Sequence, residues 1–427
     1  MEAIMQTFSL PYGHSNKQLC LNEQRINGVL VSGIHHYTPQ ASETELVRRA
    51  MISPVGSPRL CELARGKKNI VLIASDHTRP VPSKVIIPLM LNEIREGNPD
   101  ADITILIATG CHRETTRDEL VSKFGEDIVA KEKIVVHDCD DTACLTDIGT
   151  LPSGGRCVIN RLAIEADLLV SEGFIEPHFF AGFSGGRKSV LPGIAARETV
   201  LANHCAEFID SPLARTGNLT GNPIHEDMLW AAKQAKLSYI VNVVIDSDKK
   251  VIFATAGDMQ QAHAAGCEFL SSLCRTAPVM SDIVITTNGG YPLDQNIYQS
   301  VKGMTAAEAT VNEGGVIVML SRADNGHGGE AFYHQLADEA DLDKTMALFR
   351  SRGRNETKPD QWQSQIFIRV LKRARVVFVS DMDDETVRAM HMIPAHSLDE
   401  ALSIADSLTS PDAKITVIPD GVSVIVG

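Results

Sequence analysis

Short apolar runs recur along the chain, and each stops at a polar or glycine-rich turn before a helical stretch begins. The runs are Asn69–Ala74, Asp102–Ala108, Ala166–Val170, Asp282–Thr286, Gly315–Leu320 and Arg375–Ser380. Continuous apolar strands that alternate with helices of about 10–15 residues are typical of parallel sheets with helices on both faces. The pattern therefore predicts an α/β fold with mainly parallel sheets.

The length of 427 residues is enough for two or three domains. We place a boundary where Thr276-Ala-Pro278 interrupts the alternation, which gives two α/β domains, residues 1–272 and 276–427. The final stretch, 413–427, predicts a hairpin turned at Asp420-Gly421, and its packing on either domain stays open. Ligands of parallel sheets bind beyond the carboxyl ends of the strands, so we expect the active site in the cleft between the domains.

Composition narrows the classes of protein. The formal net charge of −14 disfavours nucleic acid and anionic membranes as partners. The nine cysteines are scattered without a CxxC pair, so neither a disulfide framework nor a zinc ribbon is expected. No signal-peptide pattern and no run of about 18 apolar residues is present. These features predict a soluble cytoplasmic protein, and they leave its oligomeric state, a homo-oligomer included, undecided.

The most unusual segment is the glycine-rich stretch Glu176–Gly193. Glycines at 182, 185 and 186 allow backbone N–H groups to approach a ligand closely, and Lys188 and Ser189 follow them. This is the chemistry of a phosphate cradle. It is not a Walker A loop, because Arg187 stands where that motif needs glycine. An ordinary surface turn is the alternative, but three phenylalanines, a histidine and two cations within a dozen residues favour a ligand-binding loop.

Three histidines lie close to strand ends or to this loop: His112, His178 and His204. Two histidines so placed can act as an acid and a base near neutral pH. No HExxH or similar spacing occurs, so the residues alone define no metal site. Four others are assigned ordinary structural roles, namely His14, His35, His36 and His263.

A third set of side chains suits a carboxylate. Arg79 follows a strand, and Gln299 and Lys302 fall one helical turn apart, on the same face of a predicted helix. An exposed helix lysine is the alternative for Lys302. Trp362 is one of only two tryptophans, and core packing is its default role.

Taken together, these segments resemble the nickel-dependent lactate racemase family, the 2-hydroxy-acid racemases that use a nickel-pincer nucleotide. The matching stretches are Ser75–Pro82, Ala108–Arg113, Ser171–Gly193, Ala202–His204 and Asn288–Met304. The resemblance spans essentially the whole chain. Five long motifs in the right order are far more specific than one glycine-rich loop.

The resemblance implies a cofactor and its attachment. The family's cofactor is a pyridinium-3-thioamide-5-thiocarboxylic acid mononucleotide that carries nickel. It is bound covalently to the lysine that matches Lys188, and the histidine that matches His204 completes the nickel coordination. One protein ligand suffices in such a site, which explains why the sequence shows no cluster of metal ligands. Other proteins must make the nucleotide, so cofactor-biosynthesis proteins are implied partners.

The resemblance also implies roles for the remaining residues. The proton-transfer histidines of the family match His112 and His178. Residues that bind the substrate carboxylate match Arg79, Gln299 and Lys302. Residues around the cofactor match Asp76, Phe180, Tyr298 and Trp362.

The implied reaction agrees with the chemistry of a 2-hydroxy acid. The Cα–H bond is barely acidic because the carboxylate is already charged, so direct deprotonation would give a poorly stabilised dianion. Removal of hydride, while a base takes the hydroxyl proton, gives a neutral ketone, which is pyruvate when the substrate is lactate. Return of the hydride to the other face requires a proton donor on the opposite side. Two histidines meet that requirement, and the cofactor supplies the hydride chemistry.

Three alternatives remain open at this point. The first is the same chemistry on another 2-hydroxy acid, such as malate, a branched or aromatic hydroxy acid, or an aldonate epimerised at C2. The second is a non-catalytic carrier of a nucleotide or nickel cofactor. The third is a pyridoxal-phosphate-like enzyme with Lys188 as a Schiff base.

Overall fold

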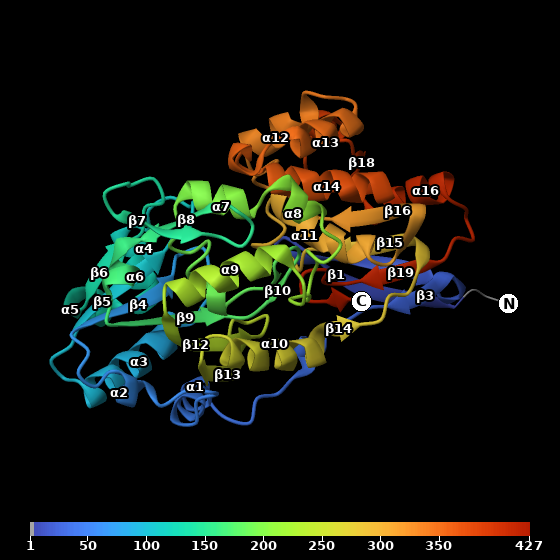
Figure 1. The fold of residues 1–427 in the computed structure, drawn as a ribbon. Helices are drawn as coiled ribbons and strands as arrows, with labels where there is room; N and C mark the ends of the chain where they lie inside the picture. Colours follow the sequence, from blue (N-terminus) through green and yellow to red (C-terminus); the bar gives the residue numbers. More distant parts are fainter. Residues whose placement is uncertain (1–3) are drawn as a thin grey trace. The chain divides into compact units, whose positions relative to one another are not determined.

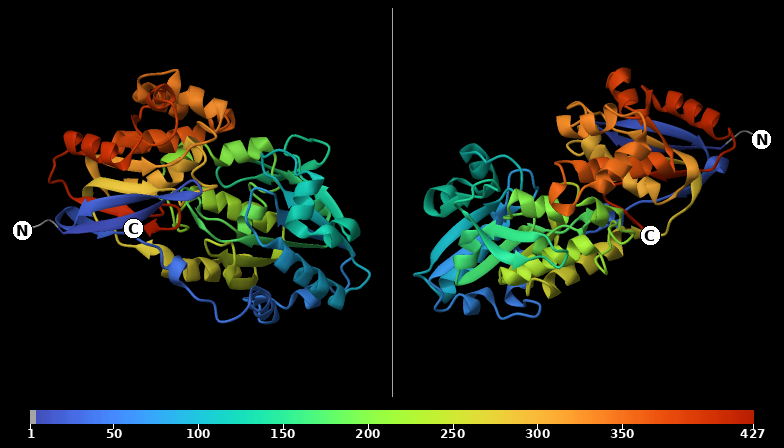
Figure 2. Two further views of the ribbon diagram at one scale, coloured as in Figure 1. Left: turned by 180° about the vertical axis from the view of Figure 1, so that it is seen from behind. Right: turned by 45° about the horizontal axis from the view of Figure 1, so that its top comes forward.

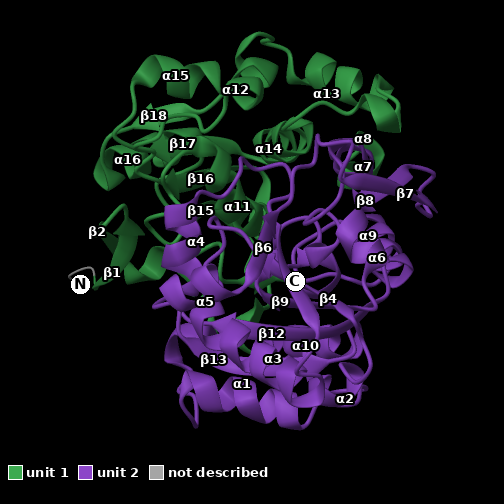
Figure 3. Cartoon of the chain, turned by 90° about the vertical axis from the view of Figure 1, so that its left-hand side faces the viewer, with its two compact units in different colours: residues 1–33, 205–210, 273–427 green, residues 34–204, 211–272 purple. Residues whose placement is uncertain are grey.

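The computed structural model describes residues 4–427 and divides the chain into two compact units. Unit 1 consists of the described part of Met1–Gly33 together with Cys205–Asp210 and Leu273–Gly427 (Figure 3). Unit 2 consists of Ile34–His204 and Ser211–Ser272. Each unit is built around one six-stranded sheet.

The sheet of unit 2 has the strand order β13-β12-β9-β4-β5-β6. All neighbouring strands are parallel except β12 and β13, which are antiparallel. The strands are β4 (Asn69–Ser75), β5 (Asp102–Ala108), β6 (Lys133–Val136), β9 (Leu168–Phe174), β12 (Leu237–Ile245) and β13 (Val251–Gly257). Because β9, β4 and β5 are adjacent and parallel, the loops that follow them emerge at one edge of the sheet.

Helices cover this sheet, as Figure 1 shows. The apolar faces of α1 and α3 bury Val47, Met51, Met90 and Ile94 against the strands. Ser42 caps α1 by accepting a hydrogen bond from the Glu45 backbone. The helices of unit 2 are α1 (Glu43–Ile52), α2 (Leu60–Leu63), α3 (Ser83–Gly97), α4 (Arg117–Phe124), α5 (Glu126–Lys131), α6 (Arg161–Glu165), α7 (Arg197–Asn203), α9 (Pro223–Gln234) and α10 (Gln261–Cys274). Short strand pairs join β7 (Leu145–Thr150) to β8 (Arg156–Asn160) and β10 (Pro177–His178) to β11 (Gly182–Phe183).

The sheet of unit 1 has the order β18-β17-β16-β15-β19-β3, and all its neighbours are parallel. The strands are β3 (Ile26–Val29), β15 (Ser281–Thr287), β16 (Val311–Leu320), β17 (Arg375–Val379), β18 (Ile393–Ala395) and β19 (Ile415–Ile418). A hairpin of β1 (Met5–Tyr12) and β2 (Ser15–Asn22), blue near the N-terminus in Figure 2, belongs to this unit. It buries Leu10, Tyr12, Leu19 and Leu21 in the same core as these strands.

The helices of unit 1 are α8 (Ala206–Asp210), α11 (Ile297–Glu308), α12 (Glu330–Ala337), α13 (Leu342–Ser351), α14 (Gln361–Arg373), α15 (Asp384–Ala389) and α16 (Leu398–Leu408). Asn296 caps α11 by accepting from the Gln299 backbone N–H at 2.9 Å. Helix α14 lies against α11, where Arg369 pairs with Glu308 through two hydrogen bonds of 2.7 Å. Among the residues that the structure describes, no helix is long and apolar enough to cross a membrane.

The prediction of an α/β fold with two mainly parallel sheets is confirmed. All six apolar runs of the sequence form strands of these sheets, β4, β5, β9, β15, β16 and β17. The strands were readable because both faces of a parallel sheet are covered, so nearly every residue in them is apolar.

The predicted domain limits of 1–272 and 276–427 differ from the structure in two ways. The N-terminal part up to Gly33 belongs to unit 1, because β3 pairs with β19. The segment Cys205–Asp210 also belongs to unit 1, where Gln365 donates to the Ala206 carbonyl and the Asp210 carboxylate, both at 2.8 Å. These are pairings between distant parts of the sequence, which local hydrophobic patterns do not encode.

The predicted hairpin over 413–427 is also replaced by a different arrangement. β19 lies inside the sheet of unit 1, between β15 and β3, and β20 (Ile425–Val426) pairs in parallel with β14 (Arg275–Thr276). The turn at Asp420-Gly421 does exist, but Gly421 donates its backbone N–H to the Thr287 carbonyl rather than closing a two-stranded ladder.

Candidate active site

Two polar loops of unit 2 meet where β4 and β5 end. Asp76 follows β4, and its side chain is only 1% exposed. His112 lies in the loop after β5, and its Nδ1 is 2.7 Å from the Asp76 Oδ2. Thr78 donates its hydroxyl to the other carboxylate oxygen of Asp76 at 2.7 Å. The parallel neighbours β4 and β5 thus bring together two residues that are far apart in the sequence.

The contact with Asp76 sets the proton positions on His112. A carboxylate can only accept, so His112 carries a proton on Nδ1 and, in the neutral ring, Nε2 is the basic nitrogen. Burial, the largest effect on Asp76, raises its pKa, but the hydrogen bond and charge of His112 together with Thr78 and Arg79 lower it below the usual value overall. Asp76 is therefore ionised at neutral pH, and it would stabilise the His112 imidazolium after a proton is taken up.

Replacement of the carboxylate in Asp76→Asn is expected to lower the rate of a reaction that transfers a proton through His112 by about 10²–10⁴-fold, because the amide no longer fixes the tautomer or stabilises the imidazolium. Asp140→Asn is the matched control, because Asp140 pairs with Arg197 in the loop after β6. Turnover rates of the two variants give the comparison. Equal rates for Asp76→Asn and wild type would remove Asp76 from the site.

The same pair has a defined dependence on pH. The folded-state pKa of Asp76 lies below its usual value of 3.8. A carboxylate with a depressed pKa stabilises the folded state above its unfolded pKa, and this stabilisation is lost as the pH falls through the folded pKa. The difference in unfolding free energy between wild type and Asp76→Asn is therefore expected to persist at about pH 5 and to shrink below pH 3.8.

The glycine-rich loop follows β9. It passes through the short pair β10 and β11 and ends in a 3-10 helix, Gly186–Ser189, which contains the half-buried Lys188. Gly185 and Gly186 have φ of 78° and 53°, a left-handed conformation that favours glycine. The Gly186 N–H donates to the Asn242 side chain on β12 at 2.8 Å. The loop is therefore held by the sheet rather than being a mobile surface turn.

Three aromatic rings connect the loop to the segment after α7. His178 lies with its ring centroid 4.5 Å from that of Phe180, and Phe180 lies 5.1 Å from His204, both in edge-to-face contact. The Ala181 N–H donates to His178 Nδ1 at 3.3 Å. An amide N–H can only donate, so the neutral His178 ring holds its proton on Nε2, the opposite of His112.

His204 has the properties of a metal ligand. Its side chain is 6% exposed, and its Nδ1 lies 2.9 Å from the Val200 carbonyl, which can only accept. Nδ1 therefore carries the proton, and Nε2 keeps its lone pair. Burial and the nearby charge of Lys188 lower the pKa of His204 to about 3, so the ring is neutral at physiological pH. A neutral imidazole oriented by a backbone carbonyl is the usual form of a histidine ligand.

The remaining predicted residues lie in unit 1, apart from Arg79, which is exposed in the turn after β4 of unit 2. Tyr298, Gln299 and Lys302 are on α11, and Trp362 is in the first turn of α14. Gln363 on α14 donates to the Tyr298 carbonyl, which joins the two helices. The Oε1 atom of Gln299 is buried and has no hydrogen-bond partner among residues 4–427. A buried amide oxygen in this state is suited to a donor group of a ligand.

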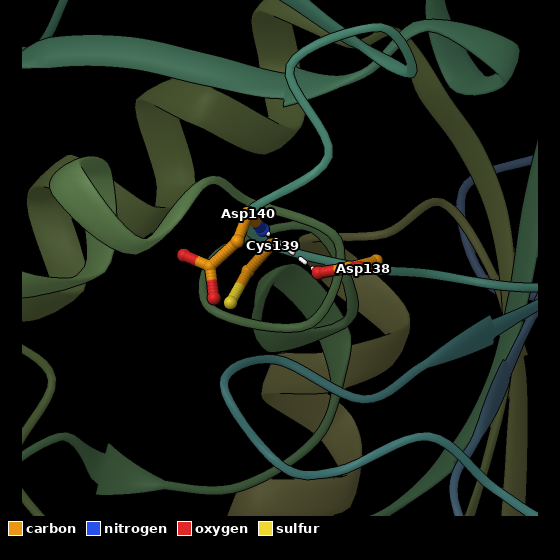
Figure 4. Close-up of side chains that lie close together, drawn as sticks. All are labelled: Asp138, Cys139 and Asp140. Atoms are coloured by element: carbon orange, nitrogen blue, oxygen red, sulfur yellow. Dashed lines mark hydrogen bonds between the residues drawn. The ribbon is translucent and has the colours of Figure 1, made fainter.

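A separate group of possible metal ligands turns out to be an ordinary loop. Asp138, Cys139 and Asp140 offer ligand atoms within 4.8 Å of one another (Figure 4). The Asp140 carboxylate is neutralised by Arg197 through hydrogen bonds of 2.8 and 2.7 Å. Asp138 accepts from the Asp140 backbone N–H at 2.9 Å. Arg197 thus neutralises one of the two carboxylates, and both carboxylates already have hydrogen-bond partners within the protein.

The structure thus brings the predicted residues of unit 2 into two connected groups. One is the pair of Asp76 and His112, and the other comprises His178, Phe180, His204 and Lys188. Sequence analysis missed Thr78, although it lies within the Ser75–Pro82 stretch. It also gave His263 an ordinary structural role and did not predict that His263 lies directly beneath the glycine-rich loop, 3.1 Å from Arg187.

Two α/β units, each built around a mainly parallel sheet, with polar loops that follow the strands of unit 2, define the class of an α/β enzyme fold. Residues 12–217 match the lactate racemase N-terminal domain, and residues 276–426 match the lactate racemase C-terminal domain. The chain belongs to the lactate racemase family and is therefore an isomerase, a racemase.

The sequences of two lactate racemases align with this chain over nearly its full length. The lactate racemase of Thermoanaerobacterium thermosaccharolyticum is 56% identical over 423 residues, which cover 99% of each chain. The lactate racemase of Lactiplantibacillus plantarum is 55% identical over 423 residues, which cover 99% of this chain and 100% of that one. The structure of the Thermoanaerobacterium thermosaccharolyticum lactate racemase apoprotein matches with a TM-score of 0.96 and 55% identity, over 99% of this chain and 100% of that one. A protein from Thermotoga maritima with a TM-score of 0.62 and 18% identity, over 90% of this chain and 98% of that one, shares the fold.

Proposed function

We propose that the protein interconverts D- and L-lactate, with pyruvate as the intermediate and His112 and His178 as the acid and base. The substrate is taken from the relatives, which are lactate racemases at 55–56% identity. The observation that carries the acid–base role is the pairing of His112 with the buried Asp76 carboxylate at 2.7 Å. A racemase needs such a group on each face of the reacting carbon.

The two histidines would act in turn. His112 accepts the hydroxyl proton of one enantiomer on Nε2, and Asp76 stabilises the imidazolium that forms. After the carbonyl group rotates, the imidazolium form of His178 would supply a proton on the other face from Nε2. That form, and the base role of His178 in the reverse reaction, require Nδ1 to give up the 3.3 Å hydrogen bond from the Ala181 N–H and to carry a proton instead. Proton exchange with solvent would restore both rings between turnovers.

Arg79, Gln299 and Lys302 are proposed to hold the substrate carboxylate. Arg79 and Lys302 supply positive charge, and the guanidinium can bind a carboxylate through two parallel hydrogen bonds. The carboxylate must stay fixed while the carbonyl group turns, because otherwise the substrate would leave as pyruvate. The side-chain N–H groups of Gln299 would orient the carboxylate, while its unpartnered Oε1 accepts from a ligand donor.

The residues of unit 2 fit the nickel-pincer nucleotide. Lys188 would form the covalent link, and the unprotonated Nε2 of His204 would bind nickel. Phe180 is in contact with His204, and we propose that Asp76, Phe180, Tyr298 and Trp362 lie around the cofactor. When bound, this group would supply a hydride acceptor for the Cα–H hydrogen of the substrate.

The implied partners and compartment follow from this cofactor. Cofactor-biosynthesis proteins must load Lys188, so protein made without them would lack activity. All nine cysteines are without disulfides. A reducing cytoplasm is therefore the proposed location.

Protein co-produced with the cofactor-making enzymes is expected to abolish the circular-dichroism signal of pure L-lactate, whereas unloaded protein leaves the signal unchanged. The reason is that hydride transfer needs the cofactor and racemisation removes the optical signal. Initial rates on lactate and malate compare the substrates. A strong preference for malate, or no decay from protein shown by mass to be loaded, would refute lactate as the substrate.

A further inference from the structure

The cation next to Lys188 is buried inside the loop instead of facing a ligand. The Arg187 side chain is 1% exposed. Its Nη2 donates to the Ala181 carbonyl at 2.7 Å, and its Nη1 donates to the Phe183 carbonyl at 2.8 Å and to the Gly185 carbonyl at 3.3 Å. One guanidinium thus connects three alternate carbonyls of the strand-like segment that leads to Lys188.

The same guanidinium is also in contact with a histidine ring on α10. The His263 ring on α10 lies with Nε2 3.1 Å from Arg187 Nη1 and 2.8 Å from the Ser184 carbonyl. A Cβ atom on Gly186 would lie 2.8 Å from that ring, so the loop backbone packs directly on His263. On the other side, a Cβ atom on Gly185 would lie 2.6 Å from the Asn242 side-chain oxygen. The loop therefore has little freedom between α10 and β12.

Stability alone does not account for a cation at this position. Among residues 4–427, no carboxylate pairs with Arg187, and the partners of its guanidinium are three backbone carbonyls and the His263 ring. Burial lowers its pKa to about 10, so it stays charged at neutral pH. A buried charge without an ionic partner costs folding free energy, and an apolar side chain of similar length would cost less.

We propose that Arg187 is a positioning residue for Lys188. By tying Ala181, Phe183 and Gly185 to one rigid planar group, it fixes the backbone that enters the 3-10 helix and holds Lys188 in one place for attachment of the cofactor. The guanidinium suits this task because its donors point in several fixed directions in one plane. The consequence for Lys188 rests on the proposed function, but the consequence for the loop does not.

The test compares Arg187→Met and Arg187→Lys with Arg156→Met, a control in which an exposed arginine loses its ion pair with Asp147. Hydrogen exchange of amides 181–189 is measured in cofactor-free, full-length protein, and intact mass gives the fraction of Lys188 that carries cofactor after co-production. Arg187→Met is expected to exchange at least tenfold faster within 181–189 alone and to carry at least tenfold less cofactor. Arg187→Lys is expected to be intermediate, because one ammonium nitrogen cannot span three carbonyls.

Two results would overturn the proposal. One is wild-type exchange and loading in Arg187→Met, and the other is full recovery of both by Arg187→Lys, which would show that charge alone matters. If Arg187→Met does not give the circular-dichroism spectrum of the folded protein, the test rests on Arg187→Lys. Its hydrogen exchange within 181–189 and its cofactor loading are then compared with wild type, provided that its melting temperature is unchanged. If wild-type protein never carries cofactor on Lys188, the proposed function fails, while the exchange result still decides the role of Arg187 in the loop.

Discussion

The Lys188→Ala variant is expected to lose both the covalent cofactor and its racemase activity, with a fall in kcat of at least about 10³-fold. The 3-10 helix Gly186–Ser189 places this lysine beside His204, close enough for its charge to lower the pKa of that histidine. Loss of the amine would remove the proposed covalent link, and without it the chain would no longer retain the cofactor. Intact mass and polarimetry on co-produced protein measure the two effects.

Two further variants test whether charge or chemistry matters at Lys188. Lys188→Arg keeps the positive charge but has no primary amine for a thioamide, so it is expected to be as inactive as Lys188→Ala. Lys250→Ala, which removes a surface ion pair with Glu43, is expected to behave as wild type. An adduct of cofactor mass in Lys188→Ala, or wild-type racemisation by either Lys188 variant, would disprove the attachment.

The strands and the site motifs could be predicted from sequence for one shared physical reason. Strands such as β4 and β5 are buried on both faces, so their apolar runs are uninterrupted, and each ends abruptly at polar residues. Asp76 and His112 lie in the polar stretches that follow these two strands. The apolar runs in the sequence therefore predicted where both residues lie relative to the strands, and the parallel pairing of β4 with β5 explains why the two side chains meet.

Domain limits could not be predicted in the same way. The strand β3 has an alternating burial pattern of half-buried and exposed residues, and it gains its place only by pairing with β19, nearly four hundred residues later. The segment Cys205–Asp210 is likewise placed in unit 1 by hydrogen bonds from Gln365. Such assignments depend on long-range pairing, which composition and periodicity along one segment do not contain.

The sequence also could not predict which ring nitrogen of each histidine carries the proton. The identity of a histidine does not say which nitrogen carries the proton, because the partner of the other nitrogen decides it. The partners here are the Asp76 carboxylate for His112, the Ala181 amide for His178 and the Val200 carbonyl for His204. Two of these three partners are backbone groups, and no residue type in the sequence indicates that a backbone group will be a hydrogen-bond partner.

Single replacement of either proton-transfer histidine is expected to stop racemisation while leaving half of the chemistry intact. His112→Ala and His178→Ala should each lower the steady-state rate by about 10²–10⁴-fold, since a general base contributes an effect of that size. Each histidine serves one enantiomer, so in a single turnover each variant should still form pyruvate from the enantiomer whose histidine remains. Acid quench and pyruvate determination per loaded site, starting from pure D- or L-lactate, make the measurement.

The pattern across the two enantiomers is what distinguishes this mechanism from general damage to the site. His334→Ala is the matched control, because this exposed histidine pairs with Glu330 and Asp338 of the same helical segment, and the variant should racemise lactate as wild type does. Loss of pyruvate from both enantiomers in one variant and from neither in the other would mean that one histidine alone transfers protons. Pyruvate from both enantiomers at the wild-type rate in either variant would remove that histidine from the reaction and assign the proton to another group, of which Asp76 is the nearest carboxylate to His112.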